Sequence, residues 1–89
     1  WRKKAVKILK KYNPKTILDV ATGTGDFAIE LAKMKPDRIV GADISQGMLD
    51  VGIKKVENKN LSNLISLELG DAENMRFQDA EFDAITVAF

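Results

Sequence analysis

The chain has 89 residues, 45% of them apolar and 30% charged, so we expect at most one small globular domain. It contains no cysteine and no histidine, which excludes disulfides, thiol nucleophiles, a histidine general base and a zinc site with those ligands. The net charge of +1 combines a basic start, with seven basic and no acidic residues in 1–15, and an acidic remainder.

The first predicted element is an amphipathic helix over residues 1–12. Its apolar side repeats at helical spacing, with lysines on the other side, and comprises Ala5, Ile8, Leu9 and Tyr12. Asn13-Pro14 ends the helix, because the residue before a proline avoids helical geometry. The lysine side is either a solvated surface or a contact with an anionic membrane.

Four short apolar runs predict β-strands, at residues 16–20, 38–43, 64–69 and 82–89. One helical pattern runs from Asp26 to Lys35, and a second follows the N-cap residue Ser45 and ends at Asn58 to Asn60. The apolar side of this second helix is expected to contain Met48, Leu49, Ile53 and Val56. The alternation predicts an α/β fold, a Rossmann-like parallel sheet with helices on both faces and strand order 3-2-1-4.

A glycine turn, Gly23-x-Gly25-x-x-Ala28, joins the first strand to the next helix. Gly23 permits a tight turn, Gly25 lets a ligand approach the backbone, and Ala28 keeps the helix close to the sheet. The same residues also occur in purely structural turns. Asp43 ends the second strand 20 residues after Gly23, where an acid either accepts ribose hydroxyls or caps a turn. Together these features favour an adenosine cofactor at the carboxyl ends of the strands.

Two carboxylates near the turn distinguish between adenosine cofactors. Asp26 begins the helix after the turn, and Asp19 lies two residues before Ala21. Both would repel the diphosphate of a dinucleotide and attract the amino and sulfonium groups of S-adenosylmethionine. The alternative role of Asp26 is to complement the helix dipole.

The third strand ends in Gly70-Asp71-Ala72. A carboxylate at Asp71 would accept the adenine amino group, and a neighbouring N–H would reach a ring nitrogen. Met48, in the first turn of its helix, would lie on the adenine face. The alternatives are an ordinary turn residue for Asp71 and core packing for Met48.

Four segments together resemble class I S-adenosylmethionine-dependent methyltransferases, and more narrowly the bacterial menaquinone/ubiquinone biosynthesis C-methyltransferases. They are ILDVATGTGD at 17–26, GADISQGML at 41–49, GDA at 70–72 and FDAIT at 82–86. The resemblance spans the whole chain. It implies that residues 1–89 are the N-terminal, cofactor-binding part of a single methyltransferase domain, a fragment of a longer protein.

The resemblance implies S-adenosylmethionine as cofactor and no metal. The methionine end would be held near Asp19 by the turn Ala21, Thr22, Gly23, Thr24 and Gly25. Asp43 would bind the ribose, and the adenine would contact Ile44, Met48, Asp71 and Ala72. Ala88 and Phe89 would lie near the transferable methyl group. No catalytic residue is assigned.

The implied activity is C-methylation of a demethylmenaquinol or related quinol, a small-molecule substrate. The alternatives are methylation of another small molecule, an NAD-dependent oxidoreductase, and a non-catalytic S-adenosylmethionine-binding domain. We expect a cytoplasmic protein, either free or peripheral to the inner face of the membrane through its basic first helix. Nucleic acid is not expected as a partner, because the acidic remainder opposes it. An oligomer is left open.

Overall fold

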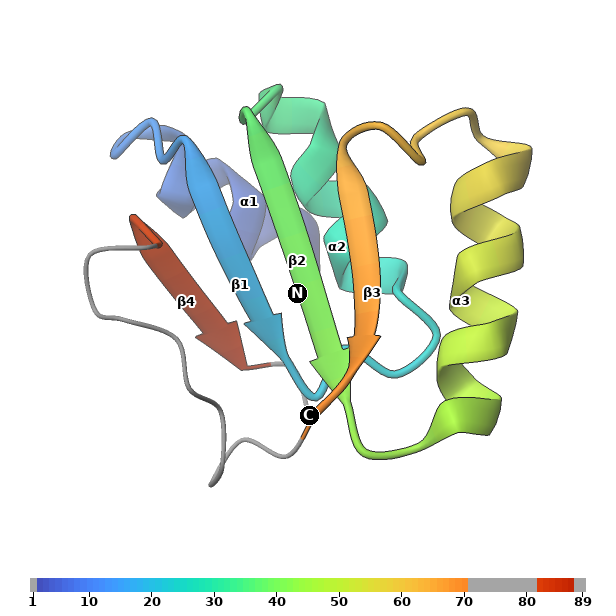
Figure 1. Cartoon of the computed structure of the whole chain (residues 1–89). Helices are drawn as coiled ribbons and strands as arrows, with labels where there is room; N and C mark the ends of the chain where they lie inside the picture. The colour runs from blue at the N-terminus through green and yellow to red at the C-terminus, as the bar shows by residue number, and fades with distance from the viewer. Residues whose placement is uncertain (1, 71–81, 88–89) are drawn as a thin grey trace.

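The computed structural model of the chain describes residues 2–70 and 82–87, and Figure 1 shows the arrangement of their elements. The helices are α1 (Arg2–Lys10), α2 (Asp26–Leu31), the 3-10 helix η1 (Ala32–Met34) and α3 (Gln46–Asn58). The strands are β1 (Thr16–Val20), β2 (Arg38–Asp43), β3 (Ile65–Leu69) and β4 (Ala84–Val87). No helix in these two ranges is long and apolar enough to cross a bilayer.

The four strands form one parallel sheet in the order β3-β2-β1-β4, which confirms the predicted order. Ile17 of β1 pairs with Ile39 of β2, and Ile39 pairs with Ile65 of β3, so these side chains form a row on one face. All three side chains are buried, and this row is the contribution of the sheet to the main core. The parallel arrangement brings the carboxyl ends of all four strands to one edge.

All three α-helices contribute side chains to the core on the Ile17 face. Val6 comes from α1, Phe27 and Leu31 from α2, and Val56 from α3, and in Figure 1 α1 and α2 lie behind the sheet. The Rossmann-like parallel sheet with helices is confirmed, and among the described residues the helices pack on the Ile17 face. On the second face, the described residues supply a smaller cluster of Leu18, Val40 and Phe82 with Val20.

The buried side of α1 differs from the predicted one. Val6 is buried, and Ala5 and Leu9 pack against it from the same side. Ile8 and Tyr12, which were predicted to face the core, are 52% and 77% exposed. Tyr12 lies beyond the end of the helix, and packing against α2 selects the stripe centred on Val6.

The prediction for α3 was right about its cap and partly wrong about its buried side. The Ser45 hydroxyl accepts a hydrogen bond from Met48 N–H at 3.3 Å, which confirms the N-cap. The buried positions are Leu49, Gly52 and Val56, whereas Met48 and Ile53 are exposed. The stripe therefore includes a glycine that apolar periodicity does not detect.

Candidate cofactor site

The turn after β1 has an unusual backbone. Ala21, Gly23 and Gly25 all have left-handed φ angles, of 58°, 60° and 82°. Thr22 N–H donates to the carbonyl of Ala42 in β2 at 2.9 Å, and Gly25 N–H donates to the carbonyl of Thr22 at 3.0 Å. The glycines are required because left-handed geometry disfavours a β-carbon, so Ala21 adopts it at a cost.

Asp43 bonds directly to this turn. One carboxylate oxygen accepts Gly23 N–H at 2.8 Å, and the other accepts Ser45 N–H at 3.0 Å. The two residues predicted to share one ligand therefore touch each other. Each carboxylate oxygen has two lone pairs, so one protein donor per oxygen leaves acceptor capacity for a ligand hydroxyl. Asp43 is half-buried, so it remains partly accessible at the carboxyl end of β2.

The turn is a poor cradle for a diphosphate, because its N–H groups are largely used within the protein. Thr22 donates to β2, Gly23 donates to Asp43, and Gly25 donates within the turn. A dinucleotide site in this type of fold relies on such N–H groups to bind its pyrophosphate. Three of the turn's N–H groups are therefore already used and are not free to bind a diphosphate.

Two exposed apolar side chains border the turn and Asp43. Ile44 is 73% exposed, and Met48 is 46% exposed. The terminal carbon of Met48 lies 3.5 Å from the point where a β-carbon on Gly23 would be, so it reaches the turn. The alternative that Met48 fills the core is therefore wrong. Exposed apolar groups beside a carboxylate acceptor suit a planar ring attached to a ribose.

Asp19 lies beneath the turn and is fully buried, with no exposed surface. Its two carboxylate oxygens accept the hydroxyls of Thr22 at 2.8 Å and of Thr86 at 2.9 Å. Burial raises the pKa of Asp19 above its ordinary value of 3.8, and the two hydroxyl hydrogen bonds offset part of this rise. Asp19 therefore contacts the turn from the protein interior, through the Thr22 hydroxyl.

The charge attributed to Asp26 is compensated. Lys55 of α3 approaches the Asp26 carboxylate at 2.9 Å and also donates to the Thr24 hydroxyl at 3.2 Å. Asp26 therefore does not repel a diphosphate as an isolated charge would. The prediction that the Asp26 charge repels a diphosphate is therefore wrong. Lys55 is 29 residues away from Asp26 in sequence, so no local pattern predicts the ion pair.

Two glycines that the sequence reasoning missed allow the turn to pack closely. A β-carbon on Gly52 of α3 would lie 2.8 Å from the carbonyl oxygen of Thr24, so α3 contacts the turn backbone directly. A β-carbon on Gly41 of β2 would lie 2.7 Å from the Thr22 hydroxyl, so the missing side chain makes room for Thr22. Glycines facing a turn from a helix and a neighbouring strand are a usable sequence signal once the turn is recognised.

The end of β3 is also attached to this site. Gly70 N–H donates to the carbonyl of Asp43 at 2.9 Å, so the chain leaves β3 directly beside the carboxylate. The predicted contacts Asp71, Ala72 and Ala88 lie outside the described residues, as does Phe89. Within the described part of the chain, no group of three or more acidic side chains is placed to hold a metal ion.

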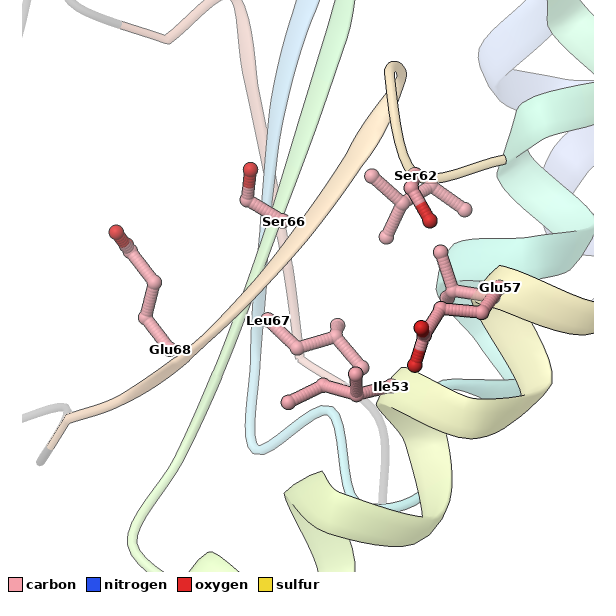
Figure 2. Close-up of a pocket in the computed structure, with 8 residues that line it drawn as sticks. Ile53, Glu57, Ser62, Ser66, Leu67 and Glu68 are labelled. Carbon is pink, nitrogen blue, oxygen red and sulfur yellow. The ribbon is translucent and has the colours of Figure 1, made fainter. Parts of the chain in front are cut away.

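A separate open groove of about 460 Å³ lies between α3 and the outer edge of β3 (Figure 2). Its lining includes Ile53, Glu57, Leu67 and Glu68, and it contains none of the predicted cofactor residues. The Leu67 side chain separates the groove from the glycine turn, since its terminal carbon lies 3.4 Å from the β-carbon position of Gly25. The groove is therefore not the predicted site.

Comparison with known proteins also favours an S-adenosylmethionine site over a dinucleotide site. Residues 1–89 match the ubiE/COQ5 methyltransferase family along their whole length. The chain belongs to this family. It is 50% identical over 90 residues to a demethylmenaquinone methyltransferase of Bacteroides fragilis, covering 100% of this chain and 37% of that protein. It is 42% identical over 91 residues to a ubiquinone/menaquinone biosynthesis C-methyltransferase of Geobacter sulfurreducens, covering 100% of this chain and 36% of that protein.

Solved structures agree with the fold of the family. A crystal structure described as a putative S-adenosyl-L-methionine-dependent methyltransferase of Methanococcus maripaludis superposes with a TM-score of 0.86 at 27% identity. The match covers 98% of this chain and 41% of that chain. The chain thus spans well under half the length of the relatives that it matches.

Proposed function

We propose that the surface at the carboxyl ends of β1 and β2 binds S-adenosylmethionine. The observation that carries this proposal is the 2.8 Å hydrogen bond between Gly23 N–H and Asp43, which fixes a partly exposed carboxylate beside the turn. Ile44 and Met48 provide exposed apolar surface on the same side. Family membership favours this cofactor over NAD, and the internal use of the turn N–H groups points in the same direction.

Each part of the site suits one part of the cofactor. The free lone pairs of Asp43 would accept the two ribose hydroxyls, and Ile44 and Met48 would contact the adenine. The turn from Ala21 to Gly25 would hold the methionine end, with the buried charge of Asp19 below it. We retain Asp71 and Ala72 as contacts for the adenine edge and Ala88 as a neighbour of the methyl group.

The proposed reaction is C-methylation of a demethylmenaquinol-type quinol, supported by the activities for which the relatives are named. S-adenosylmethionine, when bound, supplies an electrophilic methyl group. The contribution of the described residues is to hold the cofactor in one orientation and to exclude water from one side of it. We propose that residues 1–89 form the cofactor-binding part of a single methyltransferase domain, in keeping with the 37% of the B. fragilis protein that they match.

Calorimetry on the full-length protein tests the cofactor. Titration with S-adenosylmethionine is expected to give saturable binding, and titration with NAD is expected to give none. Binding of NAD alone would overturn the proposal. A methyl-transfer assay with a demethylated quinol then separates an enzyme from a domain that binds the cofactor without catalysis.

We further propose that α1 rests on the inner, anionic face of the cytoplasmic membrane, where a long-chain quinol resides. The supporting observation is that Ile8 is exposed on a helix that also exposes Lys3, Lys4, Lys7 and Lys10, and that Tyr12 is exposed just after the helix. Exposed apolar groups among lysines are typical of helices that bind at a membrane surface, and each lysine contributes about 1 kcal/mol there.

Vesicle co-sedimentation tests the membrane contact. Replacement of Lys4, Lys7 and Lys11 by Gln is expected to reduce binding to vesicles that contain phosphatidylglycerol. Replacement of Lys35, Lys54 and Lys59, which are exposed elsewhere, removes the same charge and is expected to have a smaller effect. Equal effects of the two triple variants would remove α1 as the contact.

A further inference from the structure

A continuous hydrogen-bonded path runs beneath the glycine turn and joins three strands. It begins at Ala42 of β2, whose carbonyl accepts Thr22 N–H at 2.9 Å. The Thr22 hydroxyl donates to Asp19 of β1 at 2.8 Å, and Asp19 accepts the hydroxyl of Thr86 in β4 at 2.9 Å. The turn is therefore held by β2 through a backbone hydrogen bond and by β4 through the Asp19 carboxylate.

The local structure is built to accommodate this path. Asp19 pairs in register with Gly41 on one side and with Thr86 on the other. Gly41 has no side chain, and the space beside it is occupied by the Thr22 side chain. Threonine is β-branched and has few side-chain conformations, so a hydroxyl bonded to Asp19 also fixes the orientation of the Thr22 backbone.

Stability alone does not explain an acid at this position. Asp19 is completely buried, and the groups that donate to it from Thr22 and Thr86 are neutral hydroxyls rather than a cation. Burying an ionised carboxylate without an opposite charge is unfavourable. An asparagine at the same position would accept one hydroxyl through its carbonyl oxygen and donate its NH2 group to the other, without the charge, so the fold alone does not require the acid.

We infer that Thr86 is a positioning residue for methyl transfer, which acts through Asp19 and Thr22 to fix the cofactor turn relative to β4. This inference rests on the proposed function. Thr86 does not itself need to touch the cofactor, because it constrains the carboxylate that constrains the turn. Small displacements of a reacting group from its productive position reduce rates strongly, so loss of this constraint lowers the rate more than it lowers affinity.

The experiment compares wild-type protein with Thr86→Val, which keeps the side-chain shape and removes the hydroxyl. We expect kcat to fall roughly tenfold, with less than about a threefold change in the KM for the quinol. Thr86→Ser restores the hydroxyl and is expected to return kcat to within about twofold of wild type. Ser66→Ala removes an exposed hydroxyl from β3, away from the site, and is the matched control.

A double-mutant cycle tests whether the path acts as a unit. Thr22→Val is expected to lower kcat by a similar factor, and the double variant is expected to be little worse than either single one, because both remove donors from Asp19. Rates are normalised to the cofactor-binding fraction measured by titration, so partial unfolding does not mimic the effect. Wild-type kcat in Thr86→Val, no rescue by serine, or additive losses would each overturn the inference. Failure of the wild-type protein to bind S-adenosylmethionine would instead overturn the proposed function.

Discussion

At each end of the sheet an aspartate accepts two backbone N–H groups, but the two aspartates have different roles. At the carboxyl end, Asp43 accepts the backbone N–H groups of Gly23 and Ser45. At the amino end, Asp83 accepts the N–H groups of Lys15 and Thr16, at 2.8 and 3.2 Å. Asp83 N–H also donates to the Thr16 carbonyl at 2.8 Å, so this aspartate ties the start of β4 to the start of β1.

What surrounds each aspartate differs. Around Asp43 there is a turn with three left-handed residues, and Ile44 and Met48 expose apolar surface beside it. Asp83 lies on an exposed loop between elements and completes the pairing of two strands. An aspartate that accepts two backbone N–H groups is therefore not evidence of a binding site. The evidence is its combination with a strained turn and exposed apolar side chains.

The largest expected effect separates these two aspartates. Asp43→Ala removes both ribose acceptors, and we expect the Kd for S-adenosylmethionine to rise by about 100-fold, or ~2.7 kcal/mol. Asp83→Ala is the matched control, expected to lower the free energy of unfolding by about 1 kcal/mol and to leave the Kd unchanged. Calorimetry and urea denaturation measure the two quantities. Equal losses of affinity in both variants would contradict the comparison.

The second effect concerns the contact between α3 and the turn. Gly52→Ala places a β-carbon within 2.8 Å of the Thr24 carbonyl oxygen, and we expect a loss of about 1–3 kcal/mol in the free energy of unfolding. Gly47→Ala, in the same helix with nothing within 4 Å, is expected to be neutral or slightly stabilising. Urea midpoints at constant m-value report both changes. Equal midpoints for the two variants would show that α3 does not press on the turn.

The third effect is a dependence on pH. Because burial raises the pKa of Asp19, the folded state holds its proton to a higher pH than the unfolded state does. The stability that Asp19 contributes is therefore full below pH 3.8 and is lost as the pH rises through its higher folded-state pKa. Asp19→Asn is expected to be more stable than wild type at neutral pH and to lose this advantage below pH 3.8.

The same variant is expected to bind S-adenosylmethionine more weakly, since it lacks the negative charge below the methionine end. Thermal unfolding across pH and calorimetry at neutral pH give the two readouts. A variant that is less stable than wild type at every pH would contradict the assignment of Asp19 as a costly buried charge.

The smallest effect concerns backbone strain in the turn. Ala21 has a φ of 58°, which costs a residue with a β-carbon more than it costs glycine. We expect Ala21→Gly to stabilise the protein by about 0.5 kcal/mol, because relief of strain exceeds the added flexibility of the unfolded chain. The urea midpoint measures it. A lower midpoint would mean that the turn is not strained at Ala21.

Local patterns predicted most of the fold and residues of the candidate site that lie together in the structure. The glycine turn, Asp43 and the Ser45 cap depend on residues close together in sequence or on a known spacing, and the structure brings them together. Features that depend on distant packing were missed. Lys55 meets Asp26 only because α3 folds onto the turn, and Gly52 is small for the same reason.

The first helix shows the limit of apolar periodicity. Two stripes are compatible with its sequence, and the one that contains Val6 is buried while Ile8 is exposed. Contact with α2 selects between them, and this contact is not encoded in residues 1–12 alone.

Side chains alternate strictly between the two faces along β1, so the core and the candidate site depend on the same strand register. Ile17 and Asp19 project toward the helices, and Leu18 projects toward the opposite face. Insertion or deletion of a single residue before Asp19 would exchange these faces. A carboxylate would then lie in the apolar cluster on the Leu18 face, and an aliphatic side chain would lie under the turn. We therefore expect single-residue insertions and deletions in this strand to prevent folding, whereas exposed loops tolerate them.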